Sequence, residues 1–294
     1  MKPVNELKFS CSGLHYIMCN PEKSGGLTDK QTAKVLELQG KPTLTDKQKI
    51  ELAELLAKRK AAALPSFTEA EKKHLADLWV SFQYGRHEEL DNRFIRKGNG
   101  RELEAMAMYS AMLGVMWQKN TQRITNEFIT GECDSKRGEG LNCQTIDIKC
   151  SYSLFTFTRI KVTGISPANI WQGHGYMWLY DSHKHTVVHC LMNGLPDQIE
   201  REKKYAYFAT GQNFDNDEYI QRCKQIEINH IFNRAKFEEQ NPDWQWHIER
   251  SEWTYDIDRK QRIIANVIER DPTKFNQIQT RATQCREWMQ HNLK

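Results

Sequence analysis

Two acidic residues and one lysine lie close enough in the sequence to build a hydrolytic site. Asp134 ends one expected strand, and Asp147 stands two positions before Lys149 on the next. Alternate side chains of a half-buried strand share a face, so Asp147 and Lys149 point one way while Ile146 and Ile148 point the other. Carboxylates are preferred ligands of Mg²⁺, and an adjacent lysine orients or deprotonates an attacking water. The pattern predicts metal-dependent hydrolysis.

Other polar side chains are placed to complete such a site. We expect a helix from Glu102 to about Trp117, with the Glu102 carboxylate in its first turn and within reach of the strand ends. Glu104 lies about 200° around that helix, so the two glutamates cannot face the same site. Gln172 and Tyr176 are four positions apart and share a face of a later helix.

Composition allows a nucleic-acid partner without requiring one. The 294 residues suffice for a full core, and 42 basic against 38 acidic residues give a net charge of +4. No apolar run approaches the ~20 residues that span a bilayer, and the N-terminus lacks a signal-peptide core, so we expect a cytoplasmic protein without a membrane partner. The eight cysteines form no CxxC pair, which favours free thiols over a zinc ribbon or a disulfide framework.

The order of the expected elements predicts a single α/β domain over residues 1–294, with a central mixed sheet flanked by helices. A helical N-terminal arm is expected over about 45–85, the catalytic core over about 95–192, and a helical C-terminal extension over about 195–294. In the core we expect strands near 122–134, 143–151, 154–161 and 185–192, with a helix over about 168–180. A further strand is expected near 244–255.

Together these motifs resemble the PD-(D/E)xK nuclease superfamily. The resemblance rests on Glu102, Asp134, Asp147-x-Lys149 and Gln172-x-x-x-Tyr176. The last element resembles the branch that contains RecB-type nuclease domains and phage lambda-type exonucleases. The closest resemblance is to phage-encoded recombination exonucleases, whose landmarks occur in order from residue 9 to about 192: Phe9–Leu14, Arg96–Gly98, Ile146–Ser151 with Phe155–Phe157, and Trp171–Leu179.

Two positions depart from the family pattern. Cys133 stands where many members have proline, and Asp147 stands where many have glutamate. Neither change removes a ligand oxygen, so we expect activity to survive both.

The resemblance implies a restriction-endonuclease-like architecture and a site for two Mg²⁺ ions, for which Mn²⁺ would substitute. Asp134, Asp147 and the carbonyl of Ile148 would bind one ion. Glu102 would complete a second position, directly or through water, so that the pair clamps the attacking and leaving oxygens of a phosphodiester.

The resemblance also implies roles for residues that do not bind metal. Lys149 would activate the water, and Gln172 would orient Lys149 or a substrate phosphate. Tyr176 would pack or hydrogen-bond at the rim of the site. Ser12 resembles a residue that holds the 5′-phosphate of DNA, a role compatible with an N-cap at the start of a helix.

The positions of several further residues suggest additional roles. Lys97, Arg159 and Lys161 are placed to contact the DNA backbone. We expect Phe155 and Phe157 to be core residues of a strand. We interpret His183, His185 and His189 as surface histidines rather than as zinc ligands.

These observations lead to one expected function and two alternatives. We expect a Mg²⁺-dependent exonuclease, phage- or prophage-encoded, that digests one strand of linear duplex DNA from its 5′ end. The 3′ tail would serve a strand-annealing recombinase, and a homo-oligomeric ring would enclose the DNA; polarity, recombination and ring come from the resemblance alone. One alternative is a structure-specific or restriction-type endonuclease, and the other is a non-catalytic DNA-binding module.

Overall fold

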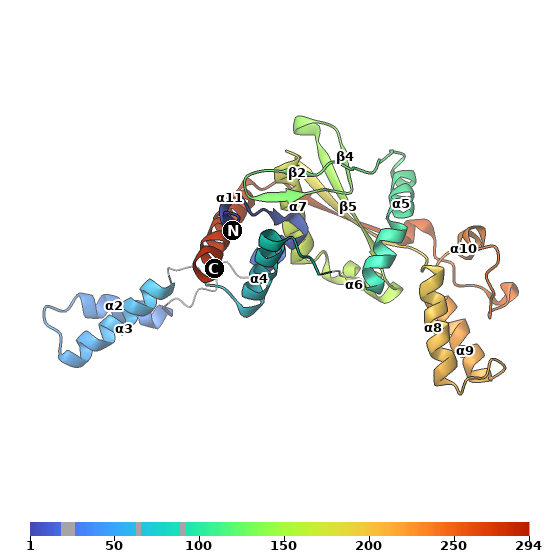
Figure 1. Ribbon diagram of the computed structural model, residues 1–294, viewed down its shortest axis with the longest axis horizontal. Coiled ribbons are helices and arrows are strands. Elements are labelled where there is room, and N and C mark those ends of the chain that lie inside the picture. The colour runs from blue at the N-terminus through green and yellow to red at the C-terminus, as the bar shows by residue number, and fades with distance from the viewer. Residues whose placement is uncertain (19–26, 63–65, 89–91, 294) are drawn as a thin grey trace.

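The computed structural model describes residues 1–18, 27–62, 66–88 and 92–293 (Figure 1). Residues 64 and 65, part of the expected break between the two arm helices, lie outside these ranges. No helix within them is long and apolar enough to cross a membrane.

The central sheet has the strand order β4–β5–β6–β7, with bounds Ser135–Arg137, Gln144–Ser151, Lys184–Leu191 and Ile263–Glu269. β5 and β6 are parallel, and their register places Lys149 beside His189. Parallel neighbours need a crossover, which α6 (Leu154–Thr163) and α7 (Pro167–Leu179) supply. β4 and β7 run antiparallel at the two edges. The expected α/β fold with a mixed central sheet is therefore confirmed.

Different helices cover the two faces of this sheet. Ile146 and Ile148 join α5 (Arg93–Leu113) in one apolar cluster. On the opposite face, Val187 of β6 packs with Met177 of α7. Because side chains alternate along β5, Asp147 and Lys149 lie on the face that α7 covers.

A smaller sheet consists of strands that precede those of the central sheet in the sequence. Its order is β1–β3–β2, with bounds Phe9–Ser10, Ile129–Gly131 and Ile124–Thr125. Cys11 follows β1 and packs so tightly that a Cβ added at Gly131 would lie 2.6 Å from its sulfur, and one at Gly175 would lie 2.9 Å away. Glycine at both positions therefore lets the N-terminal turn, β3 and α7 approach closely, which fixes the segment that continues to Asp134.

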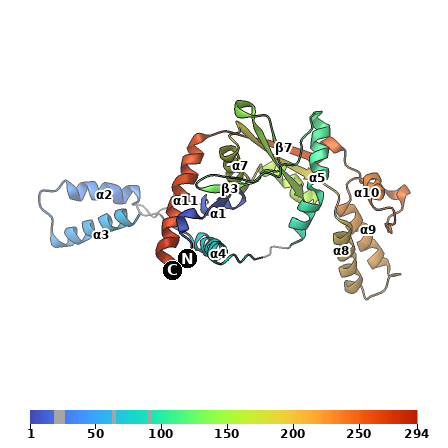
Figure 2. The ribbon, with the colours of Figure 1, turned by 45° about the horizontal axis from the view of Figure 1, so that its top comes forward.

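The remaining helices pack around the core or extend from it. α1 (Leu14–Met18), α4 (Glu69–Tyr84) and α11 (Pro272–Asn292) share an apolar cluster with the smaller sheet. α2 (Asp29–Gln39) and α3 (Asp46–Ala62) form a helical arm that projects from one end of the molecule, while α8 (Pro196–Ala209), α9 (Asp217–His230) and α10 (Arg234–Gln240) gather at the other end (Figures 1 and 2).

One expected strand is a helix. The segment 154–161 belongs to α6, because the Ser153 hydroxyl accepts a hydrogen bond from the Thr156 amide and the Thr156 hydroxyl accepts one from the Ser153 amide in a capping box. Phe157 is buried as expected, whereas Phe155 is 72% exposed, since neighbouring helical residues point in different directions.

Other element bounds also differ from the expectation. The expected strand over 122–134 is divided into β2 and β3, and the region 244–255 contains no strand. Instead β7, which the sequence analysis assigned to a helical extension, adds an edge strand to the central sheet. α5 begins at Arg93, where Asn92 caps its N-terminus, so Glu102 lies in the third turn rather than the first.

Candidate active site

Asp147 and Lys149 form an ion pair on β5. Lys149 Nζ lies 2.6 Å from Asp147 Oδ2, and the lysine side chain keeps 35% of its surface exposed while the aspartate is buried. The Lys149 ammonium therefore already balances the charge of the buried Asp147 Oδ2.

Asp134 is held at the same strand edge by the backbone. Its Oδ2 accepts a hydrogen bond of 2.6 Å from the Ile148 amide. The N–H and C=O of one residue in a strand point to the same edge, so the Ile148 carbonyl faces the side on which Asp134 lies. The structure thus brings together two carboxylates and the carbonyl that the sequence analysis assigned to metal binding.

Glu102 reaches this edge from α5 through a second lysine. Its carboxylate bonds to Lys119 Nζ, which also lies 3.7 Å from Asp134 Oδ1. Glu104 faces elsewhere and pairs with the buried Arg101 at 2.8 Å. The predicted separation of the two glutamates therefore holds, although the helix starts earlier than expected. Lys119 is not among the expected site residues, because a lysine on a connecting loop carries no recognisable motif.

Like charges and burial perturb the titration of these groups. The pKa of Asp134 is raised to about 7, first by burial and then by the charge of Asp147, and the Ile148 amide opposes the shift. Burial disfavours the charged form of Lys149, but Asp147, Asp134 and Glu102 outweigh it and raise the pKa of the ammonium. A divalent cation between the carboxylates would relieve their repulsion and hold Asp134 ionised.

Gln172 and Tyr176 support Asp147 from α7. Gln172 Nε2 lies 3.4 Å from Asp147 Oδ1 and donates a 3.0 Å hydrogen bond to the Tyr176 hydroxyl. Gln172 thus contacts the carboxylate that pairs with Lys149, and its expected role of orienting Lys149 or a substrate phosphate stays a prediction. Tyr176 packs and hydrogen-bonds as expected, in a buried position, and burial raises the pKa of its hydroxyl.

Two histidines expected at the surface lie inside. His185 and His189 on β6 are buried, and His185 Nδ1 bonds to Thr145 Oγ1 at 2.9 Å. Burial lowers the pKa of each ring to about 4, so both are neutral near pH 7. They pack beside Asp147 and Lys149 without adding positive charge. The alternation of β6 could have revealed them, because His185, Val187 and His189 fall on one strand face.

The residues expected to contact DNA have different surroundings. Arg159 and Lys161 are exposed on α6. Ser12 is exposed as well, but Ser10 rather than Ser12 caps the short 3-10 helix Cys11–Gly13 by accepting from the Gly13 amide. Lys97 is 0% exposed and donates to the Tyr152 carbonyl at 2.9 Å, so it does not face a DNA backbone as expected.

The donor set fits a hard divalent cation. Within the described ranges no three His, Cys, Asp or Glu side chains already converge as a metal cluster, since Glu102 and Asp147 are turned toward lysines. The oxygens of Asp134 and Asp147 and the Ile148 carbonyl are nevertheless the kind that Mg²⁺ prefers. The repulsion between the two aspartates favours a cation at this edge.

Comparison with known proteins identifies the fold. No protein-family model and no curated protein sequence matches the chain. A phage-related exonuclease from Haemophilus somnus is similar, with a TM-score of 0.58 at 20% identity over 96% of this chain and 93% of that one. An alkaline exonuclease from Laribacter hongkongensis has a TM-score of 0.52 at 13% identity, over 98% and 90%. Its complex with dAMP has a TM-score of 0.52 at 12% identity, over 98% and 91%. The chain therefore shares the fold of these exonucleases along almost its whole length.

Proposed function

We propose that this protein is a Mg²⁺-dependent exonuclease that hydrolyses one strand of linear duplex DNA. The observation that carries the proposal is the convergence of Asp134, Asp147 and the Ile148 carbonyl at one edge of β5, with Lys149 beside them. The likeness of the fold to solved exonucleases along almost the whole chain supports it.

Each side chain has a definite task in this reaction. Asp134 and Asp147, with the Ile148 carbonyl, would hold Mg²⁺, and Glu102 would serve a second position after release from Lys119. When bound, the ion supplies Lewis-acid polarisation of the phosphodiester and charge neutralisation. Lys149, whose side chain is partly exposed, orients the attacking water through its ammonium N–H groups and stabilises the negative charge that develops on the phosphate. Gln172 fixes the Asp147 carboxylate, and through it the position of Lys149.

We extend the proposal to digestion from the 5′ end, supply of a 3′ single-stranded tail to a strand-annealing recombinase, and assembly as a homo-oligomeric ring around DNA. These three points rest on the resemblance of the sequence motifs to phage recombination exonucleases. Solution mass with and without duplex DNA tests the ring directly.

The experiment that tests the enzymatic proposal compares two substrates. Linear duplex and the same plasmid as a covalently closed circle are incubated with the purified protein and Mg²⁺. We expect release of nucleotides from the linear form only, and no release with EDTA or with Asp147→Ala. Cutting of the closed circle would instead identify an endonuclease, and the absence of release from either substrate would favour a non-catalytic DNA-binding module.

A further inference from the structure

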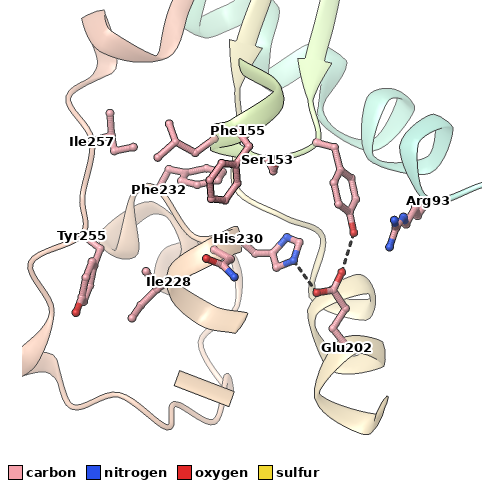
Figure 3. A pocket seen from close by; sticks show the side chains of 12 residues that line it. Arg93, Ser153, Phe155, Glu202, Ile228, His230, Phe232, Tyr255 and Ile257 are labelled. Carbon is pink, nitrogen blue, oxygen red and sulfur yellow. Dashed lines mark hydrogen bonds and ion pairs between the residues drawn. The ribbon is translucent and has the colours of Figure 1, made fainter. Parts of the chain in front are cut away.

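A cavity of ≈ 380 Å³ lies at the C-terminal end of the catalytic strand, separate from the metal-site residues (Figure 3). The turn from β5 to α6 forms one wall with Tyr152, Ser153 and Phe155, and Arg93 at the start of α5 stands beside it. The C-terminal part of the chain closes the other side. Tyr152 follows Lys149 by three residues, which is about 10 Å along an extended strand. The cavity is therefore within one or two nucleotides of the candidate active site.

Aromatic side chains line much of this cavity. Phe155 and Tyr255 are 72% and 41% exposed, and Phe232 forms a buried part of the wall. The Arg93 guanidinium lies 4.9 Å from the centre of the Tyr152 ring. A large exposed aromatic ring at the mouth of a cavity is a platform on which a flat ring can stack, and an arginine beside it adds attraction for a phosphate.

The opposite wall carries a polar network in which one buried atom has no hydrogen-bond partner. The Tyr152 hydroxyl donates to Glu202 Oε1 at 2.7 Å, and His230 Nε2 lies 3.0 Å from Glu202 Oε2. A carboxylate only accepts, so His230 Nε2 is the donor in this contact. Nδ1 is buried without a hydrogen-bond partner, and in Figure 3 it points away from Glu202 toward the side of Ser153 and Phe155. A polar edge of a ligand would satisfy it.

The N-terminus of α6 borders the same space. Ser153 caps this ten-residue helix and uses its hydroxyl on the Thr156 amide. The remaining amides of the first turn, with the positive end of the helix dipole, favour an anion. Together with Arg93 these amides favour a negatively charged group, while the aromatic wall and His230 favour a flat ring with a polar edge.

We propose that this cavity, the base pocket, binds an unpaired 2′-deoxynucleotide of the DNA strand next to the active site. The base stacks on Phe155, its polar edge hydrogen-bonds to His230 Nδ1, and a phosphate lies between the α6 N-terminus and Arg93. This inference rests on the proposed function, since it assigns the pocket to the same substrate. It also gives the C-terminal part of the chain a role, because that part supplies Glu202, His230 and Tyr255.

The test is a binding measurement without hydrolysis. Fluorescence anisotropy of a labelled ten-nucleotide single strand is recorded in EDTA, beside a strand of equal length whose sugars carry no bases. The variants are Phe155→Ala and Tyr255→Ala, both at exposed positions, and the matched control is Phe208→Ala, an exposed phenylalanine of α8 outside the pocket.

We expect Phe155→Ala to lower affinity for the normal strand roughly tenfold, the scale of one lost base–aromatic stack, and to leave the abasic strand unchanged. Tyr255→Ala should act in the same direction and Phe208→Ala should have no effect. Equal affinity of wild type and Phe155→Ala, or an equal loss on both strands, would overturn the proposal. Competition by free dAMP at the oligonucleotide's own concentration would overturn the assignment to a nucleotide within a strand.

Failure of this inference is separable from failure of the proposed function. If the protein binds bases through Phe155 but releases no nucleotides from linear duplex, the base pocket is supported and the exonuclease assignment is wrong. If the protein degrades linear duplex and Phe155→Ala binds DNA as tightly as the wild type, the exonuclease assignment is supported and the base pocket is wrong.

Discussion

At the edge of β5, Asp134 Oδ2 accepts a 2.6 Å hydrogen bond from the Ile148 amide. The carboxylate thus occupies the position that a neighbouring strand would otherwise take. Backbone pairing of β4 with β5 begins at Ser135 opposite Ile146, so beyond that point the edge is completed by a side chain. The arrangement leaves a carboxylate and a strand carbonyl facing one another next to Lys149. An edge made in this way can bind a cation, whereas a continuous strand pair would have used the same carbonyl for sheet formation.

Asp147→Ala and Lys149→Ala should each lower hydrolysis of linear duplex by on the order of 10³-fold or more. The first removes a metal ligand and the second removes the group that serves the water, and each loss costs several kcal/mol of transition-state stabilisation. Single-turnover rates with Mg²⁺ measure the effect. Asp215→Ala, at an exposed loop position, is the matched control. Wild-type turnover by a folded Asp147→Ala protein would remove the active-site assignment.

Glu102→Ala should cost less, about 10- to 100-fold, because Glu102 contacts Lys119 rather than the central carboxylates. Glu104→Ala should leave the chemical step nearly unchanged, since that side chain pairs with Arg101 on another side of α5. Rates at saturating Mg²⁺ compare the two variants. A larger loss in Glu104→Ala would mean that the wrong face of α5 has been assigned to the site.

Metal preference should follow the oxygen-only ligand set. We expect Mg²⁺ and Mn²⁺ to support turnover and Ca²⁺ to support DNA binding with little turnover, because its larger, looser coordination shell positions the water poorly. Nuclease assays and gel-shift experiments with each ion measure this. Stoichiometric zinc or iron in protein purified without added metal, lost on Cys→Ser substitution, would contradict the prediction of free thiols.

Lys97 should make stability depend on pH. Burial lowers its pKa from 10.5 to about 7, so between these values the unfolded chain binds the proton and the folded protein does not. Stability relative to Lys97→Met should therefore rise as pH increases from about 7 to 10, by at most ~1.4 kcal/mol per pH unit. Below pH 7 both states are protonated and the difference should be constant.

Urea unfolding of the wild type and Lys97→Met at several pH values measures this dependence. The substitution also removes the hydrogen bond to the Tyr152 carbonyl, an offset of about 1 kcal/mol that does not change with pH. Lys136→Met, at an exposed position of β4, controls for loss of a surface lysine. Parallel stability curves for wild type and Lys97→Met would show that the buried amine keeps its ordinary titration.

The sequence predicted which side chains share a face better than it predicted the elements that carry them. Alternation along β5 placed Asp147 and Lys149 on one face, and helical geometry separated Glu102 from Glu104, because both inferences depend on fixed local periods. α6 was misread because its β-branched and aromatic residues are typical of a strand, whereas the Ser153 capping box makes it a helix.

Features that depend on tertiary packing were beyond prediction from sequence. β7 is an edge strand that pairs with β6 across a long sequence separation. Its local sequence pattern therefore gives only a weak strand signal beside the surrounding helical segments. The burial of Lys97 follows from how α5 packs against the turn after β5, and no local pattern indicates it. The bond between Lys119 and Glu102 is likewise set by the course of a loop.

The last prediction concerns Ser12 and the ends of the substrate. Ser10, not Ser12, caps the helical turn, so the exposed Ser12 hydroxyl is not needed there and makes only a 3.4 Å contact with Ser10 Oγ. Packing of Cys11 against Gly131 and Gly175 fixes this turn to the same elements that position Asp134 and Gln172. If Ser12 binds a terminal 5′-phosphate, as the resemblance implies, phosphorylated ends should be degraded faster.

We expect the wild type to favour linear duplex with 5′-phosphate over 5′-hydroxyl ends by roughly tenfold, the scale of one or two charge-assisted hydrogen bonds. Ser12→Ala should lose most of this preference while its rate on hydroxyl ends stays near that of the wild type. Ser251→Ala, at an exposed position of the C-terminal part, should keep the preference. End-labelled substrates report both the rate and the strand that is consumed. Equal wild-type rates on the two ends, or degradation from the 3′ terminus, would leave the metal-site chemistry intact but contradict 5′ polarity, because a 5′-phosphate site has no role in an enzyme that starts from the other end.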